Sequence, residues 1–156
     1  MSTAIEDRFE IMDTATRMMW AIDTGDWELL GTVFAEKVVL DFTSYWGGEP
    51  QTSTPAETVA TWSALFASFE ATQHLLGNHL VTVDGDRAVL TAASQATHRL
   101  SDPFGPPLFT IGGTYRFALV RVGDGWKIEH VVFSATWADG NRNVLSLAVA
   151  ALESGD

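Results

Sequence analysis

The first apolar pattern along the chain predicts an amphipathic helix over residues 4–24. Its apolar positions are spaced by three, four and seven residues, which places them on one face of a helix. These positions are Ile5, Phe9, Met12, Met19 and Ile22. Gly25 is suited to end this helix, and Asp26 to cap the start of a second, short one.

The next segments predict a strand, a loop and a third helix. Residues 37–46 are rich in β-branched and aromatic side chains, which is typical of a strand. A loop with two glycines and Pro50 follows. "TPAE" at 54–57 then has the pattern of a capping box with proline at the first helical position, so a helix is expected over about 55–69.

The second half of the chain predicts four long strands. Residues 74–83 and 87–100 flank "DGD", and residues 108–122 and 126–137 flank "GDG", two strong hairpin signals. The segment 101–108 holds three prolines and must be a loop, and the tail 138–156 carries a short helical pattern. Helices followed by strands, without βαβ alternation, predict an α+β fold with a mostly antiparallel sheet.

Composition narrows the classes of function. The 156 residues suit one domain spanning 1–156, and 9 basic against 20 acidic residues give a net charge of −11. Such a surface repels phosphate backbones and anionic membranes, so neither nucleic acid nor membrane is an expected partner. With no cysteine there is no thiol nucleophile, and with no long apolar run or apolar leader we expect a cytoplasmic protein.

Two polar residues stand out within apolar patterns. Asp23 lies on the face of the first helix that should pack on the sheet, where an unpaired carboxylate is costly. His74 opens an otherwise apolar strand; strict alternation would place His79 on the opposite face of the sheet. The alternative for Asp23 is a side chain turned to solvent at the end of the helix.

The later strands offer further candidates for a pocket. His98 shares its face with Ser94 and two alanines, small residues that leave room for a ligand or for a covering helix. Tyr115 could donate a hydrogen bond to a substrate or serve only as a core aromatic. Arg121 shares its face and could contact an anionic group, although it lies beside a turn and could equally be solvated.

These features together resemble a known superfamily. "AIDTGDWELL", "VVLDFTS", "TQHLLGN", "QATHR", "IGGTYRF" and "DGWKI" occur in an order similar to the cystatin-like cone of the nuclear transport factor 2 superfamily. Within it, the chain resembles the SnoaL-like proteins, scytalone dehydratase and hexachlorocyclohexane dehydrochlorinase over roughly residues 5–137. The resemblance implies a cone-shaped α+β barrel whose helices and curved sheet enclose a pocket.

The resemblance also implies roles for the candidate residues. His74 matches the histidine that removes a proton from the substrate, Asp23 the aspartate that orients it, and His98 a second pocket histidine. In this hypothesis His98 or Tyr115 is the acid or oxyanion donor. The two substrate-polarising tyrosines of scytalone dehydratase correspond here to Ile22 and Phe42. The expected reaction is an elimination, isomerisation or cyclisation.

We expect the remaining pocket wall to be apolar. Phe42, Trp46 and Trp62 are candidates for it, so the expected substrate is small, mostly apolar and ring-containing. No metal-ligand spacing and no phosphate or dinucleotide motif is present, so neither metal nor cofactor is predicted. A homodimer or homotrimer is expected by analogy. Two alternatives remain open: a non-catalytic ligand-binding module, and an interaction protein with an incidental cavity.

Overall fold

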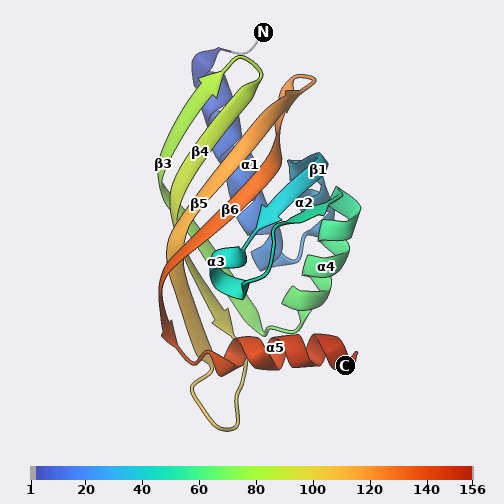
Figure 1. Cartoon of the computed structure of the whole chain (residues 1–156), viewed down its shortest axis with the longest axis vertical. Coiled ribbons are helices and arrows are strands. Elements are labelled where there is room, and N and C mark those ends of the chain that lie inside the picture. The colour runs from blue at the N-terminus through green and yellow to red at the C-terminus, as the bar shows by residue number, and fades with distance from the viewer. Residues whose placement is uncertain (1–2, 156) are drawn as a thin grey trace.

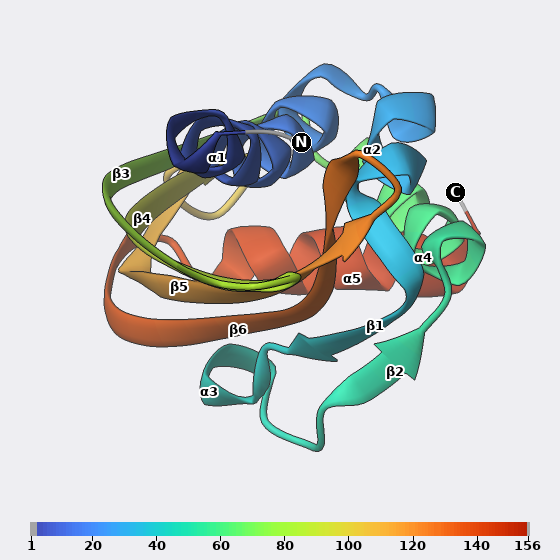
Figure 2. The ribbon, with the colours of Figure 1, turned by 90° about the horizontal axis from the view of Figure 1, so that it is seen from above.

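The computed structural model describes residues 3–155, which form a curved six-stranded sheet with helices against its concave side (Figures 1 and 2). The predicted α+β class is thereby confirmed. In chain order the elements are α1 (Ala4–Thr24), α2 (Trp27–Val33), β1 (Phe34–Asp41), α3 (Thr43–Trp46), β2 (Gln51–Ser53), α4 (Pro55–Ala67), β3 (Ala71–Asp84), β4 (Arg87–Arg99), β5 (Leu108–Val122), β6 (Gly125–Gly140) and α5 (Asn143–Ser154).

The sheet is open and mixed. Its strands lie in the order β2-β1-β6-β5-β4-β3, and only the β1–β6 pair among them is parallel. The two predicted hairpins, β3–β4 and β5–β6, form with turns at Gly85 and Gly123, where positive φ angles suit glycine. Helix α5 crosses one end of the concave side, so the long strands and the helices enclose the interior (Figure 1).

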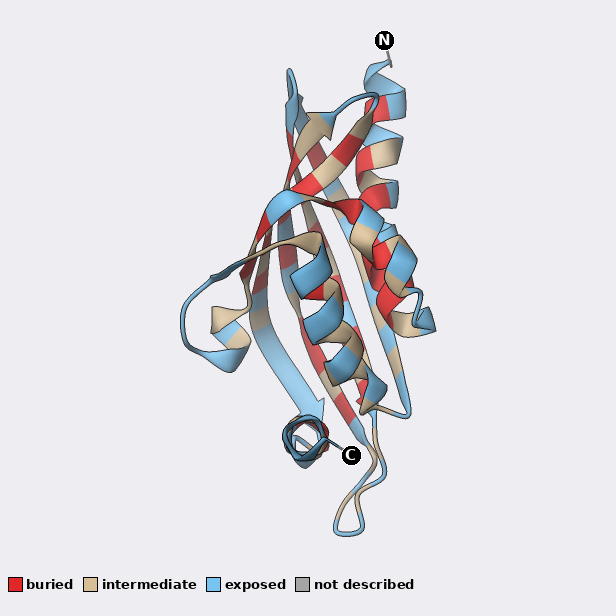
Figure 3. Ribbon diagram, turned by 90° about the vertical axis from the view of Figure 1, so that its right-hand side faces the viewer, coloured by how far each residue is buried: buried red, intermediate tan, exposed pale blue. Residues whose placement is uncertain are grey.

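The core fills the space between the sheet and the helices. Buried positions alternate along β4 and β5 and form one stripe along α1, as the bands in Figure 3 show. The largest fully buried side chains include Trp126, Phe117, Ile11, Met18 and Leu30. None of the described helices is both long and apolar enough to cross a membrane.

The buried stripe of α1 differs from the predicted one at its beginning. Ile5 and Phe9 were expected inside but are 67% and 69% exposed, whereas Asp7 and Ile11 are buried. The reason is an ion pair: both carboxylate oxygens of Asp7 accept hydrogen bonds from Arg121 at 2.9 Å. This long-range contact holds the Asp7 face against the sheet, and Ile5 and Phe9 turn outward.

The predicted strand 37–46 was too long. β1 ends at Asp41, whose carboxylate accepts hydrogen bonds from the backbone N–H and the hydroxyl of Thr43. This local capping turns the chain into the helical turn α3. The loop that follows also contains the short strand β2, which pairs with β1 and was not predicted.

A bulge in β3 overturns the predicted facing of His79. The pairing with β4 shifts by one residue between Gly77 and Leu80, and Asn78 adopts a left-handed conformation with φ 53°. One extra residue exchanges the two faces of a strand. His74 and Leu76 therefore turn inward before the bulge, and His79 and Val81 turn inward after it.

Candidate functional site

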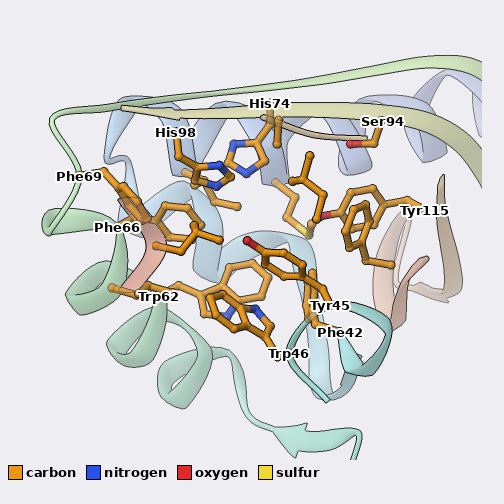
Figure 4. Close-up of a pocket in the computed structure, with 17 residues that line it drawn as sticks. Phe42, Tyr45, Trp46, Trp62, Phe66, Phe69, His74, Ser94, His98 and Tyr115 are labelled. Carbon is orange, nitrogen blue, oxygen red and sulfur yellow. The ribbon is translucent and has the colours of Figure 1, made fainter. Parts of the chain in front are cut away.

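An apolar pocket lies between the concave face of the sheet and the helices α1, α3, α4 and α5 (Figure 4). Its volume is about 100 Å³. For comparison, a cavity of roughly 150 Å³ can hold benzene. The wall is mostly aromatic and aliphatic, and it includes the polar side chains of Tyr45, His74, Ser94, His98 and Tyr115. A pocket of this volume therefore admits at most about one small ring.

Asp23 and His74 are hydrogen-bonded at the edge of this pocket. Oδ1 of Asp23 lies 2.6 Å from Nδ1 of His74, and Oδ2 accepts the backbone N–H of His74 at 2.7 Å. The side chains of His74 and Asp23 are 6% and 18% exposed. Because Nδ1 is engaged by the carboxylate, Nε2 is the nitrogen available to a molecule in the pocket.

The local folding of two elements brings this pair together. Asp23 lies in the last turn of α1, which ends with Gly25 in a left-handed conformation. His74 lies near the start of β3, on the strand edge that α1 covers. Thr72, two residues earlier on the same face, donates its hydroxyl to Oδ1 of Asp23 at 2.9 Å. Three donors therefore hold the carboxylate in one orientation.

Thr72 was not a sequence candidate. The sequence indicated Thr72 only through its position two residues before His74, because this spacing places both side chains on one face of a strand. That signal becomes useful only once Asp23 is known to lie beside β3.

His98 stands next to His74 inside the pocket. Their ring centroids are 5.6 Å apart, and the Phe69 ring lies 5.1 Å from that of His98. Burial and the neighbouring His74 lower the pKa of His98 to about 4, although a hydrogen bond to the backbone of Phe109 and the charge of Asp23 act in the opposite direction. His98 is therefore a neutral imidazole at neutral pH.

The Nδ1 atom of His98 is buried and has no hydrogen-bond partner within residues 3–155. In a neutral imidazole one ring nitrogen is a donor and the other is an acceptor.

The other predicted wall residues also line the cavity, with one exception. Phe42, Trp46, Trp62, Ser94 and Tyr115 all border it. Burial raises the pKa of Tyr115, so its hydroxyl keeps its proton.

Arg121 is the exception, since it lies outside the pocket. It binds Asp7 with two hydrogen bonds and Asp86 with a third at 3.1 Å, and its guanidinium stacks 4.4 Å from the centre of the Trp126 ring. This cluster joins α1 to the β5–β6 hairpin. The expectation that Arg121 contacts a ligand in the pocket was wrong, because acidic partners distant in sequence hold it elsewhere.

Sequence reasoning missed Tyr45. The predicted strand 37–46 did not identify Tyr45 as a pocket residue, but α3 turns its side chain into the pocket (Figure 4). Burial raises the pKa of Tyr45 to about 12, against a smaller opposite effect of Arg142. An aspartate followed two residues later by threonine, as at Asp41 and Thr43, was the available sign that the strand ends early.

A second, more open cleft adjoins the pocket. Its volume is about 570 Å³, and it lies between α3, β2 and α4. Phe42, Trp46, Trp62 and Leu65 line both spaces and therefore form the partition between them. Throughout residues 3–155, no group of three or more histidine, aspartate or glutamate side chains is arranged to hold a metal ion.

Comparisons with solved structures agree on this architecture over nearly the whole chain. Kfla4162 from Kribbella flavida is 30% identical, with a TM-score of 0.86 over 94% of this chain and 99% of that one. A Novosphingobium aromaticivorans protein, provisionally named an aromatic ring hydroxylase, is 27% identical, with a TM-score of 0.78 over 92% and 99% of the two chains. No curated protein matches the chain.

More distant structures share the fold and confirm the predicted resemblance. A scytalone dehydratase-like protein from Novosphingobium aromaticivorans is 18% identical, with a TM-score of 0.74 over 88% of this chain and 89% of that one. A hexachlorocyclohexane dehydrochlorinase is 13% identical, with a TM-score of 0.75 over 88% and 90%. The model of the SnoaL-like domain matches residues 3–132. The chain therefore belongs to the SnoaL-like domain family.

Proposed function

We propose that this protein is a cofactor-independent lyase or isomerase in which His74 acts as a general base. The observation that carries the proposal is the 2.6 Å contact between Asp23 and Nδ1 of His74, beside an apolar pocket. A carboxylate bound to one imidazole nitrogen selects the tautomer whose other nitrogen is unprotonated and stabilises the imidazolium once it forms. Such a base contributes about 10²–10⁴-fold in rate.

The reaction can be written from the groups in the pocket. Nε2 of His74 takes a proton from a substrate carbon, and the electron pair of that C–H bond becomes the second bond of a C=C. The leaving group, hydroxide or halide, departs from the adjacent carbon with its bonding pair. A departing hydroxide then takes the proton back from His74 and leaves as water, whereas after loss of halide His74 releases the proton to solvent. In an isomerisation, His74 instead returns the proton to another carbon.

Family and size support this class of reaction and substrate. The chain has a SnoaL-like fold shared with a dehydratase-like protein and with a dehydrochlorinase, which supports a lyase- or isomerase-type family. A pocket of about 100 Å³ favours a substrate with a single ring, and its mostly apolar wall favours an uncharged one. The low pKa of His98 keeps its imidazole uncharged at neutral pH, which also favours an uncharged substrate.

A screen of six-membered-ring β-hydroxy and β-halo ketones tests the proposal. Release of water or halide is followed by NMR with the native chain, His74→Gln and Asp23→Asn. The expected result is turnover by the native chain and a loss of about 10²-fold or more in both variants. Turnover that both variants retain, or a native chain inactive on the whole panel, would overturn it.

A binding module is the second candidate. It is favoured by Ile22 and Phe42, which line the pocket as apolar groups and offer no hydrogen bond to a substrate. In that case a ring compound would bind the native chain without conversion, and His74→Gln would leave its affinity unchanged.

A further inference from the structure

The open cleft between α3, β2 and α4 has no part in the reaction proposed above. Its volume is about 570 Å³, against about 100 Å³ for the pocket. Clefts that bind drug-sized ligands measure roughly 300–1,000 Å³, so the cleft falls in this range and the pocket lies below it. The pocket therefore has room for a reacting ring only, and the cleft has room for the rest of a larger molecule.

The partition between the two spaces lies across the pocket from the candidate base. Its members line both the pocket and the cleft, and they are Phe42, Trp46, Trp62 and Leu65. In Figure 4, the labelled rings of Phe42, Trp46 and Trp62 lie on the opposite side of the pocket from His74. A molecule that enters from the cleft therefore turns its leading end toward His74.

Trp46 is the member of the partition that is free to move aside. It is 52% exposed, whereas Trp62 is half-buried and packs edge-on at 5.9 Å against the rings of Phe34 and Phe42. Helix α3 itself is anchored, since Ser44 makes hydrogen bonds of 2.7 and 3.0 Å to the backbone of β6. Exposed side chains change rotamer within picoseconds to nanoseconds, so Trp46 can swing without any movement of α3.

The lining of the cleft favours an uncharged aromatic group. The exposed residues Glu49 and Glu57 contribute two carboxylates, and none of the described residues that line the cleft carries a positive charge. Hydrogen bonds from the backbone N–H and the hydroxyl of Thr54 lower the pKa of Glu57, which keeps this carboxylate ionised. An anion is therefore repelled, whereas an aromatic ring can pack on the exposed indole of Trp46.

We propose that the cleft binds a second, uncharged aromatic ring of the substrate, and that the first ring reaches the pocket past Trp46. This inference rests on the proposed function and names its substrate class, two linked rings without an acid group. The reacting ring lies beside His74, and the second ring packs between Trp46 and Thr61, a residue of α4 that lines the cleft but not the pocket. Both rings leave water, so each adds to the affinity.

Three ring ketones test the inference by isothermal titration calorimetry, without requiring turnover. Cyclohexanone carries the first ring alone, 4-phenylcyclohexanone adds the second ring, and 4-(4-oxocyclohexyl)benzoate adds an acid group to it. The native chain should bind 4-phenylcyclohexanone at least about tenfold tighter than cyclohexanone, and the benzoate should lose most of this gain. Trp46→Ala removes the stacking surface and Thr61→Phe fills the cleft, so in both variants the ratio of the first two affinities should fall to near one.

The controls separate the cleft from unspecific binding and from the base. Trp20→Ala is the matched variant and should keep the native ratio, because Trp20 is 63% exposed on α1 and lines neither space. A native ratio near one, a tenfold ratio that Thr61→Phe retains, equal affinities for the phenyl and benzoate compounds, or no binding of any of the three would each overturn the inference. The same ratios are expected in a His74→Gln background. A protein that shows them without His74-dependent turnover would therefore refute only the proposed function.

Discussion

Asp23 and His74, 51 residues apart in sequence, make two hydrogen bonds with each other, one to the ring and one to the backbone. The backbone bond fixes where the carboxylate lies along β3. The ring bond fixes which imidazole nitrogen faces the pocket. This double contact joins the end of α1 to the start of β3 and leads to the first two predictions.

Asp23→Asn should abolish most turnover while the protein still folds. The amide oxygen can accept the His74 backbone N–H, and the amide NH₂ then faces Nδ1. The ring must adopt the tautomer with the proton on Nε2, which can no longer accept one from a substrate. We expect a loss of at least about 10²-fold in kcat on any substrate found, measured beside the circular dichroism spectrum. Asp13→Asn, on an exposed position of the same helix, is the matched control and should retain activity.

Thr72→Val should lower kcat by several-fold and leave KM nearly unchanged. Thr72 contacts the carboxylate rather than the pocket, so it acts by positioning Asp23. A hydrogen bond to a charged group is worth about 1.5–3 kcal/mol, but the two donors of His74 still hold the carboxylate, so only part of this is lost from kcat. Thr72→Ser restores the hydroxyl and should restore kcat. A Thr72→Ser variant as slow as Thr72→Val would contradict the positioning role, because a packing defect does not respond to the hydroxyl.

Stability should fall as the solution is acidified, with a contribution from His98. Its pKa is about 4 in the folded protein against 6.5 as the ordinary value, so the unfolded chain binds more protons between these pH values. The contribution is complete above about pH 6.5, decreases as pH falls toward 4 and is constant below; it is on the order of 3 kcal/mol. Urea unfolding of the native chain and of His98→Gln, at several pH values, measures it. Equal pH slopes for the two proteins would contradict the prediction.

Asp7→Ala should destabilise the fold without a direct effect on the pocket. Asp7 is buried and accepts hydrogen bonds from Arg121 and from Nε1 of Trp126 at 3.0 Å. Removing one partner of a buried ion pair typically costs about 3 kcal/mol. Denaturant unfolding measures the change. Asp13→Ala removes an exposed ion pair with Arg17 on the same helix and should have little effect. Comparable losses in the two variants would argue against a structural role for the Asp7 cluster.

Much of the fold follows from short-range patterns in the sequence. The capping box at Thr54 and Glu57, the glycine turns of both hairpins, and the alternation that places Ser94 with His98 are all present as predicted. These features depend on interactions within a few residues, which sequence spacing reports directly. The same spacing placed Asp23 on the buried face of α1 and His74 on an inward position of β3.

Tertiary structure decided the details that spacing cannot report. The pairing of Arg121 with Asp7 joins residues 114 positions apart, and it determines both which face of α1 is buried and why Arg121 lies outside the pocket. The bulge at Asn78 reverses the facing of His79.

The place of Tyr45 in the pocket also depended on distant contacts. It follows from the anchoring of α3 on β6 through Ser44. The sequence by itself thus determined most of the elements and the candidate base. Only the tertiary structure decided which side chains meet it, because bulges, registers and long-range ion pairs depend on contacts between segments far apart in the chain.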